Sequence, residues 1–184
     1  MKKNNLSTGN GAHYLKIGFL VTLIVLAIVV YWLNSNKIMF QVRNYETGEV
    51  VYQRIMRLGE TFTLEYIHSV TAQPVYEVFF VKDQNTLALQ EMRYDSFGAN
   101  LPAGSEKLRD EETRFIVEKG FYKILYENRS FQIVPLRVGQ VIADHTLVFE
   151  DGERLRFLDL VGGGTYVEYY VSPWLKAFYR KELR

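Results

Sequence analysis

The sequence contains no cysteine among its 184 residues. This absence excludes disulfides, thiolate-bound metals, lipid attachment of the bacterial lipoprotein kind and a thiol nucleophile. Histidine is scarce as well, with three residues, and no His-x-x-x-His spacing indicates a metal centre. A Gly-x-Ser-x-Gly nucleophile elbow is also missing. We therefore expect no catalytic residues of a known type, no metal ligands and no cofactor.

Charge is missing from one long stretch near the start of the chain, Ile17–Asn36. The part that ends at Leu33 is almost wholly apolar, and a helix needs roughly 20 such residues to cross a bilayer core. Tyr31 and Trp32 close the apolar run, where amphipathic rings favour the headgroup zone. The pattern predicts a transmembrane helix over residues 17–36, preceded by a cytoplasmic tail over residues 1–16.

Two features of this segment distinguish an uncleaved signal anchor from a cleaved signal peptide. The apolar core exceeds the roughly 7–15 residues of a signal peptide, and no Ala-x-Ala cleavage pattern follows it. These features favour the signal anchor, with the cleaved signal as the alternative. Three lysines precede the span, whereas only Lys37 and Arg43 follow it closely. The bias predicts a single-pass protein of the cell membrane with its C-terminal domain extracytoplasmic.

The rest of the chain, residues 37–184, has the size of one domain with one core. All 21 acidic residues but only 18 of the 22 basic ones lie after Lys37, so residues 38–184 carry a formal charge of −3. A nucleic-acid partner is excluded, because its footprint would be strongly basic.

Aromatic residues are abundant in this region, and short alternating segments are separated by turn residues. The pattern predicts an all-β domain, an antiparallel β-sandwich or barrel of about nine or ten short strands. We expect two hairpins, one joining 122–126 to 131–134 and one joining 146–149 to 155–160 across Asp151-Gly152. After Ser172-Pro173, a plausible helix start, apolar and basic residues alternate at helical spacing and predict a short C-terminal amphipathic helix.

Two carboxylates interrupt otherwise apolar strands, Glu77 and Glu91. A regular strand pairing places both on one face, where a carboxylate needs a partner. With His68, which ends the alternating segment 61–68, they form a predicted polar pocket. Its alternatives are outward-facing carboxylates and a half-buried structural histidine. His68 and Ser69 are not a nucleophile pair, because neighbouring strand residues point to opposite faces.

A second cluster begins at Glu91 and continues through Tyr94, Asp95 and Ser96 to Pro102. Glycine and proline close together predict a loop of fixed shape, and such loops on a β scaffold often carry ligand groups. The predicted ligand-binding residues of the two clusters are His68, Ser69, Glu77, Glu91, Tyr94, Asp95 and Ser96.

Four segments resemble a family of small bacterial proteins of unknown function that usually carry one N-terminal apolar segment. They are Tyr66-Ile-His-Ser-Val70, Pro74-Val-Tyr-Glu77, Tyr94-Asp-Ser-Phe-Gly-Ala-Asn-Leu-Pro102 and Arg137-Val-Gly139. Members are often encoded beside tripartite ATP-independent periplasmic (TRAP) transporters of the TAXI type. The resemblance implies an extracytoplasmic accessory to transport, with the TRAP membrane subunits or the solute-binding protein as partners.

Three functions remain open on the sequence alone. The first is a non-enzymatic, membrane-anchored binding or accessory domain, associated with the TRAP system and the lipid bilayer. The second is an envelope hydrolase or metal-dependent enzyme that uses His68 with Glu77 or Glu91. The third is a purely structural spacer.

Overall fold

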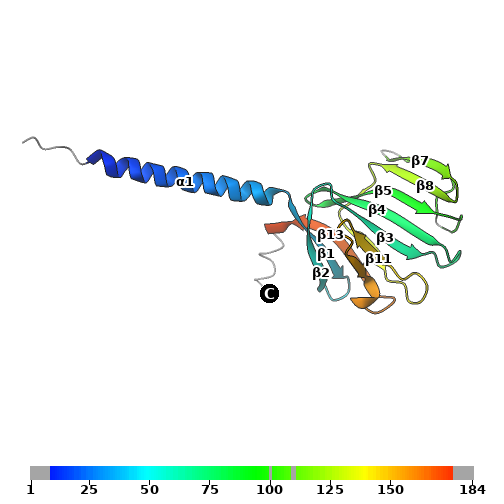
Figure 1. Cartoon of the computed structure of the whole chain (residues 1–184). Helices are drawn as coiled ribbons and strands as arrows, with labels where there is room; N and C mark the ends of the chain where they lie inside the picture. The colour runs from blue at the N-terminus through cyan, green and yellow to red at the C-terminus, as the bar shows by residue number, and fades with distance from the viewer. Residues whose placement is uncertain (1–8, 100, 109–110, 176–184) are drawn as a thin grey trace, which may run out of the picture. The chain divides into compact units, whose positions relative to one another are not determined.

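A computed structural model describes residues 9–99, 101–108 and 111–175 (Figure 1). The chain divides into two compact units, Met1–Asn36 and Lys37–Arg184, and each is described by itself. The first eight residues of the predicted cytoplasmic tail and most of the predicted C-terminal helix lie outside the described residues.

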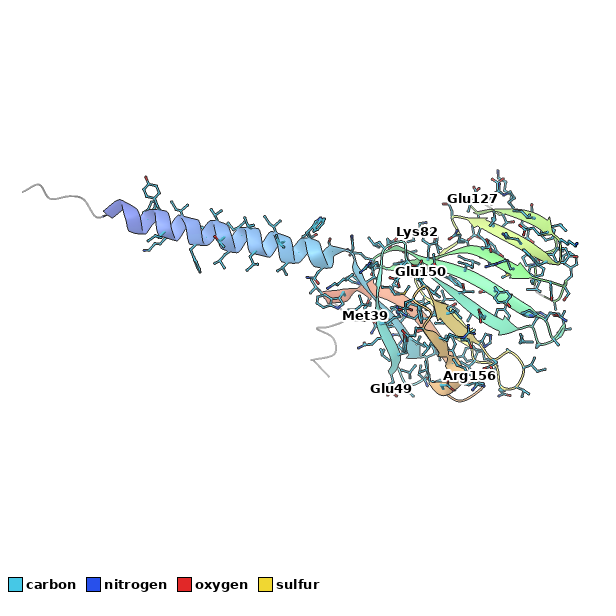
Figure 2. All side chains as sticks on the ribbon, viewed as in Figure 1. Met39, Glu49, Lys82, Glu127, Glu150 and Arg156 are labelled. Atoms are coloured by element: carbon cyan, nitrogen blue, oxygen red, sulfur yellow. The ribbon has the colours of Figure 1, made fainter. Side chains whose placement is uncertain are left out.

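The first unit contains one helix, α1, which spans Gly9–Ser35. Its candidate membrane span is His13–Trp32, twenty residues with a mean hydropathy of 2.4 and none of them buried (Figure 2). Twenty helical residues are about 30 Å long, the thickness of a bilayer core. The helix therefore has the length and composition to cross a membrane, as predicted, although it begins within the predicted tail. A signal sequence has the same length and composition, so cleavage stays a separate question.

The second unit is an all-β sandwich, as predicted, and every paired strand in it is antiparallel. The smaller sheet has the order β10 (Val134–Arg137), β13 (Tyr166–Pro173), β1 (Lys37–Asn44), β2 (Val50–Arg57). The larger sheet has the order β12 (Arg154–Arg156), β11 (Thr146–Phe149), β3 (Thr61–Ile67), β4 (Pro74–Asp83), β5 (Thr86–Tyr94), β8 (Phe121–Glu127), β7 (Glu111–Glu118), β6 (Lys107–Leu108), with β9 (Ser130–Phe131) also on β5. A short 3-10 helix, η1 (Phe157–Asp159), follows β12.

The core between the sheets is built from aromatic rings. Phe62 of the larger sheet lies 5.2 Å from Phe40 and 6.1 Å from Tyr169, both on the smaller sheet. Phe79 and Phe149 contact Phe62 from within its own sheet. All five side chains are buried, which explains why period-2 alternation with aromatic residues is the dominant pattern of the sequence.

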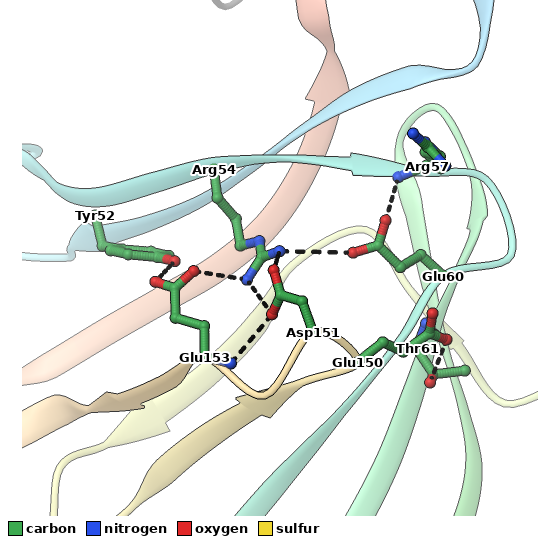
Figure 3. Close-up of polar contacts among 8 residues, drawn as sticks. All are labelled: Tyr52, Arg54, Arg57, Glu60, Thr61, Glu150, Asp151 and Glu153. Atoms are coloured by element: carbon green, nitrogen blue, oxygen red, sulfur yellow. Dashed lines mark hydrogen bonds and ion pairs between the residues drawn. The ribbon is translucent and has the colours of Figure 1, made fainter.

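A polar network also joins the two sheets (Figure 3). Arg54 on β2 donates to Glu153 at 2.8 Å and to Asp151 at 2.7 Å, both in the β11–β12 hairpin. Its guanidinium lies 4.0 Å from the Phe149 ring centroid, and Tyr52 donates to Glu153 at 2.6 Å. Because the carboxylates are exposed, each pair adds little stability, and the network mainly fixes how the hairpin meets β2.

Three local predictions need correction. Phe131 pairs with Leu87 of β5, and Val134 pairs with Tyr169 of β13, so the predicted hairpin between 122–126 and 131–134 is wrong. The turn between β11 and β12 has three residues rather than two, because Phe149 and Glu153 still bond across it. Its glycine, Gly152, has a φ of +87°, as this turn requires.

The predicted C-terminal helix also starts later than expected. Ser172 and Pro173 belong to β13, where they pair with Met39 and Ile38. A helix therefore begins no earlier than Trp174, and residues 176–184 lie outside the described part of the chain.

Candidate functional site

A cleft of about 450 Å³ opens at one end of the larger sheet. One wall is the end of β3 and the residues after it, 66–69, and the other is the segment 137–145 that follows β10. The side chains and backbone that line it are Tyr66, Ile67, His68, Ser69, Arg137, Val138, Gly139, Gln140, Ala143, His145 and Gly164. Two predicted ligand-binding residues, His68 and Ser69, therefore lie in one cleft.

Backbone hydrogen bonds hold the two walls together. The Ile67 N–H donates to the Ala143 carbonyl at 3.0 Å, and the Gly164 N–H donates to the Val138 carbonyl at 2.7 Å. The loop also packs closely on itself, since a Cβ at Gly139 would lie 2.5 Å from the Cβ of Ala143. The cleft therefore has a fixed floor and fixed walls before any ligand enters.

His145 forms part of the second wall and is only 8% exposed. Its Nδ1 accepts a hydrogen bond from the Gly139 N–H at 3.1 Å, and its ring centroid lies 5.2 Å from that of Tyr66. Burial lowers the pKa of His145, against a smaller opposing effect of Asp144. The folded domain thus holds a neutral imidazole whose proton is on Nε2.

This burial predicts a pH dependence of stability. In the unfolded chain His145 binds a proton near pH 6.5, whereas in the folded chain it binds one only at a lower pH. The contribution is fully present above about pH 6.5 and is lost as the pH falls toward the lowered pKa. We expect the free energy of unfolding to fall less steeply between pH 7.5 and 5 in His145→Gln than in the wild type. Denaturant titrations across this range measure it, and parallel curves for both proteins would contradict the assignment.

His68 is held by backbone groups on both ring nitrogens. Its Nδ1 accepts from the N–H groups of Val70 and Thr71, each at 3.3 Å, and its Nε2 donates to the Ala99 carbonyl at 2.9 Å. The ring packs so closely on Gly98 that a Cβ there would lie 2.8 Å from Cε1. His68 therefore fastens the loop after β3 to the loop after β5, joining the two segments that the sequence singled out.

Replacing His68 by alanine should loosen both loops. Removing three hydrogen bonds at once is expected to cost about 1–3 kcal/mol and to speed proteolysis within residues 95–102. Ser69→Ala is the matched control, because Ser69 is exposed and forms no hydrogen bond with the described residues. Thermal melts with limited proteolysis measure the effect, and equal cleavage rates in the two variants would argue against the fastening role.

Glu77 lies on the inner face of β4, directly behind the cleft wall. The Tyr66 hydroxyl, which belongs to that wall, donates to Glu77 Oε1 at 3.1 Å. Burial raises the pKa of Glu77, and the Tyr66 bond and Arg129 oppose this only in part. The buried hydroxyl of Tyr169 has no hydrogen-bond partner among the described residues, and burial, with Glu77 next, raises its pKa. The Glu77 carboxyl group thus lies behind Tyr66 and accepts the hydrogen bond of its hydroxyl.

Glu91 does not join this group, so the expected shared face with Glu77 is wrong. Phe79 of β4 pairs with Leu89 of β5, and the next residue of β4, Val78, pairs with Glu91. Gln90 therefore has no partner on β4 and forms a bulge. A bulge shifts the alternation by one residue, and Glu91 turns to the outer face. There it pairs with Arg93 at 2.6 Å and Lys123 at 3.8 Å.

The remaining predicted residues lie in and beside the loop after β5. Tyr94 is buried and its hydroxyl donates to the Pro102 carbonyl. Tyr94 and Asp95 line a smaller pocket of about 130 Å³ with Arg93, while the Ser96 hydroxyl is buried without a partner among the described residues. The seven predicted residues therefore divide between two hollows, the inner face of the larger sheet (Glu77), its outer face (Glu91) and one loop interior.

The histidines of the cleft bond to the backbone, His68 through both ring nitrogens and His145 through Nδ1. Among the described residues no hydrogen bond joins the Ser69 hydroxyl to a base, as nucleophilic catalysis by this serine would require. Within the described part of the chain, no three His, Asp or Glu side chains come together as metal ligands.

Sequence reasoning missed three residues of the second wall, Arg137, Gln140 and His145, as ligand-binding candidates. Arg137 ends β10 and the other two follow it, and the neighbour of β10 in the sheet is β13, some thirty residues further along the chain. The Arg137-Val-Gly139 segment of the resemblance was the one available signal for this wall.

Comparisons with known proteins give a family for the chain. Searches of curated proteins and of solved structures gave no match. One family, described as a Domain of unknown function (DUF1850), matches residues 62–155. This range covers both walls of the cleft apart from Gly164 and more than half of the sequence. The chain therefore belongs to the DUF1850 family.

Proposed function

We propose that this protein is a membrane-tethered, non-enzymatic binding domain that receives its ligand or partner in the cleft. The observation that carries the proposal is the cleft itself, which is preformed and lined by polar groups that the fold holds in place. The apolar helix α1 supports the tether. A preformed concave site with few polar groups is typical of ligand recognition.

The side of the membrane and the partner are part of the same proposal. The three lysines before the uncharged stretch favour an extracytoplasmic domain. The resemblance to proteins encoded beside TAXI-type TRAP transporters suggests the transporter subunits or the solute-binding protein as partner. Protease added to intact protoplasts should digest the domain if it is extracytoplasmic. Full protection of residues 38–184 would contradict this orientation.

A cleft-blocking variant tests the binding role. Ser69→Trp should fill the cleft with an indole ring, whereas Gln84→Trp places the same ring on the exposed β4–β5 turn. We expect the wild type and Gln84→Trp to co-purify from detergent with the transporter subunits at native expression levels, and Ser69→Trp to do so much less. A protein that always purifies alone would contradict the proposed partner. Equal recovery of both variants would contradict the proposed role of the cleft.

The hydrolase alternative gains no support from the described geometry. His68 is occupied on both nitrogens, Glu77 is buried behind Tyr66, and Glu91 is on the opposite face. The spacer alternative predicts that Ser69→Trp and Gln84→Trp behave alike in every assay.

A further inference from the structure

Arg137 is the only charged side chain among the residues that line the cleft. It is exposed at the end of β10, and its guanidinium lies 5.1 Å from the ring centroid of Tyr166, which faces it across the sheet. It forms no ion pair with a carboxylate of the described residues, unlike the arginines around it. Stacking on a ring leaves all of the guanidinium N–H groups available.

Two acids next to lining residues in the sequence, Asp144 and Glu65, are paired with other arginines. Asp144 binds Arg156 at 2.6 Å, and Glu65 binds Arg154 at 2.6 Å. Glu168 lies on β13, two residues after Tyr166, and it binds Arg43. Each of these pairs removes a negative charge that would otherwise neutralise Arg137. The cleft consequently combines one uncompensated cation with no acidic lining residue.

Exposed apolar residues adjoin the lining residues along the chain in both walls. Val70 follows the lining residue Ser69 and is 74% exposed, while Val141 and Ile142 follow Gln140 and are 86% and 47% exposed. Exposed aliphatic residues next to a concave site offer a surface that an apolar ligand can cover. A purely inorganic anion would leave all three in water.

From this juxtaposition we propose, building on the binding role above, that the cleft recognises a carboxylate carried on an apolar body. Arg137 pairs with the carboxylate, for which the guanidinium fork has matching geometry. Val70, Val141 and Ile142 cover the aliphatic part. Two sources present this chemistry, a free small acid and the C-terminal residue of a polypeptide.

Matched probes test the proposal on the full-length chain in nanodiscs. The probes are N-acetyl-leucine, its neutral amide N-acetyl-leucinamide, and a hexapeptide that ends in leucine as the free acid or as the amide. We expect the acids to bind at least tenfold more tightly than the amides, and Arg137→Gln to abolish this preference. Arg114→Gln, which removes another exposed arginine without an ion pair among the described residues, should leave it intact. Tighter binding of the peptide acid supports a polypeptide terminus as the source, and tighter binding of N-acetyl-leucine supports a free acid.

Three results would overturn the carboxylate proposal: equal binding of acid and amide, an unchanged preference in Arg137→Gln, or no binding of any acid at millimolar concentration. The proposed function fails separately. If Ser69→Trp still blocks co-purification while Arg137→Gln does not, the cleft remains a binding site and only the carboxylate chemistry is wrong.

Discussion

Phe62→Ala is expected to lower the free energy of unfolding by about 3–5 kcal/mol. The side chain is 1% exposed and its ring contacts those of Phe40, Phe79, Phe149 and Tyr169. Deleting it removes contacts with both sheets and leaves a cavity that backbone hydrogen bonds prevent from closing. A loss of this size is a large share of the total stability of a small domain.

Denaturant unfolding of the detergent-solubilised chain, followed by the β-sheet signal in circular dichroism, measures this loss. Tyr45→Ala is the control, because Tyr45 is 65% exposed and its removal should change stability by less than about 0.5 kcal/mol. A similar loss in both variants would mean that Phe62 is not the centre of the core.

Gly163→Ala is the second large expected effect. A Cβ at Gly163 would lie 2.8 Å from the Cα of Gln140, a backbone atom that cannot move without shifting the cleft wall. Overpacking of this kind costs about 1–3 kcal/mol, and we expect binding in the cleft to weaken at the same time. The adjacent glycine provides a control, because at Gly162 the nearest atom, the Thr165 hydroxyl, is 3.9 Å away.

The two alanine variants are compared by thermal melting and by binding of N-acetyl-leucine. Gly162→Ala should match the wild type in both measurements, since its φ is not positive and space is open around it. If Gly163→Ala also matches the wild type, the close approach of Gln140 is not a constraint. The triple glycine would then be a flexible connection, the simpler interpretation of the sequence.

The positions of most strands were predictable because alternation is a local property. Thr61–Ile67, with Phe62 and Leu64 on one face, is such a case. Strand partners were not predictable, as Phe131 shows, because the choice between β8 and β5 depends on segments forty residues away. The bulge at Gln90 likewise has no local signal in the sequence. Because of this one extra residue, Glu91 lies on the outer face of the sheet instead of sharing the inner face with Glu77.

The candidate site divides in the same way. His68 and Ser69 stood out in the sequence because they follow an alternating segment directly and belong to one of the segments that carry the family resemblance. Arg137 is the cation on which the proposed chemistry depends. Two facts of the structure identify it: β10 pairs with β13, and the acids Glu65 and Asp144 form ion pairs with other arginines. Charge compensation is a property of three-dimensional neighbours, so no spacing rule reports it.

Asn36 alone separates α1 from β1 along the chain. If α1 is held in a bilayer, this connection keeps the β-domain, and the cleft with it, at that membrane. Partners anchored in the same membrane then meet the cleft at a high effective concentration, whereas molecules free in solution meet it at their bulk concentration.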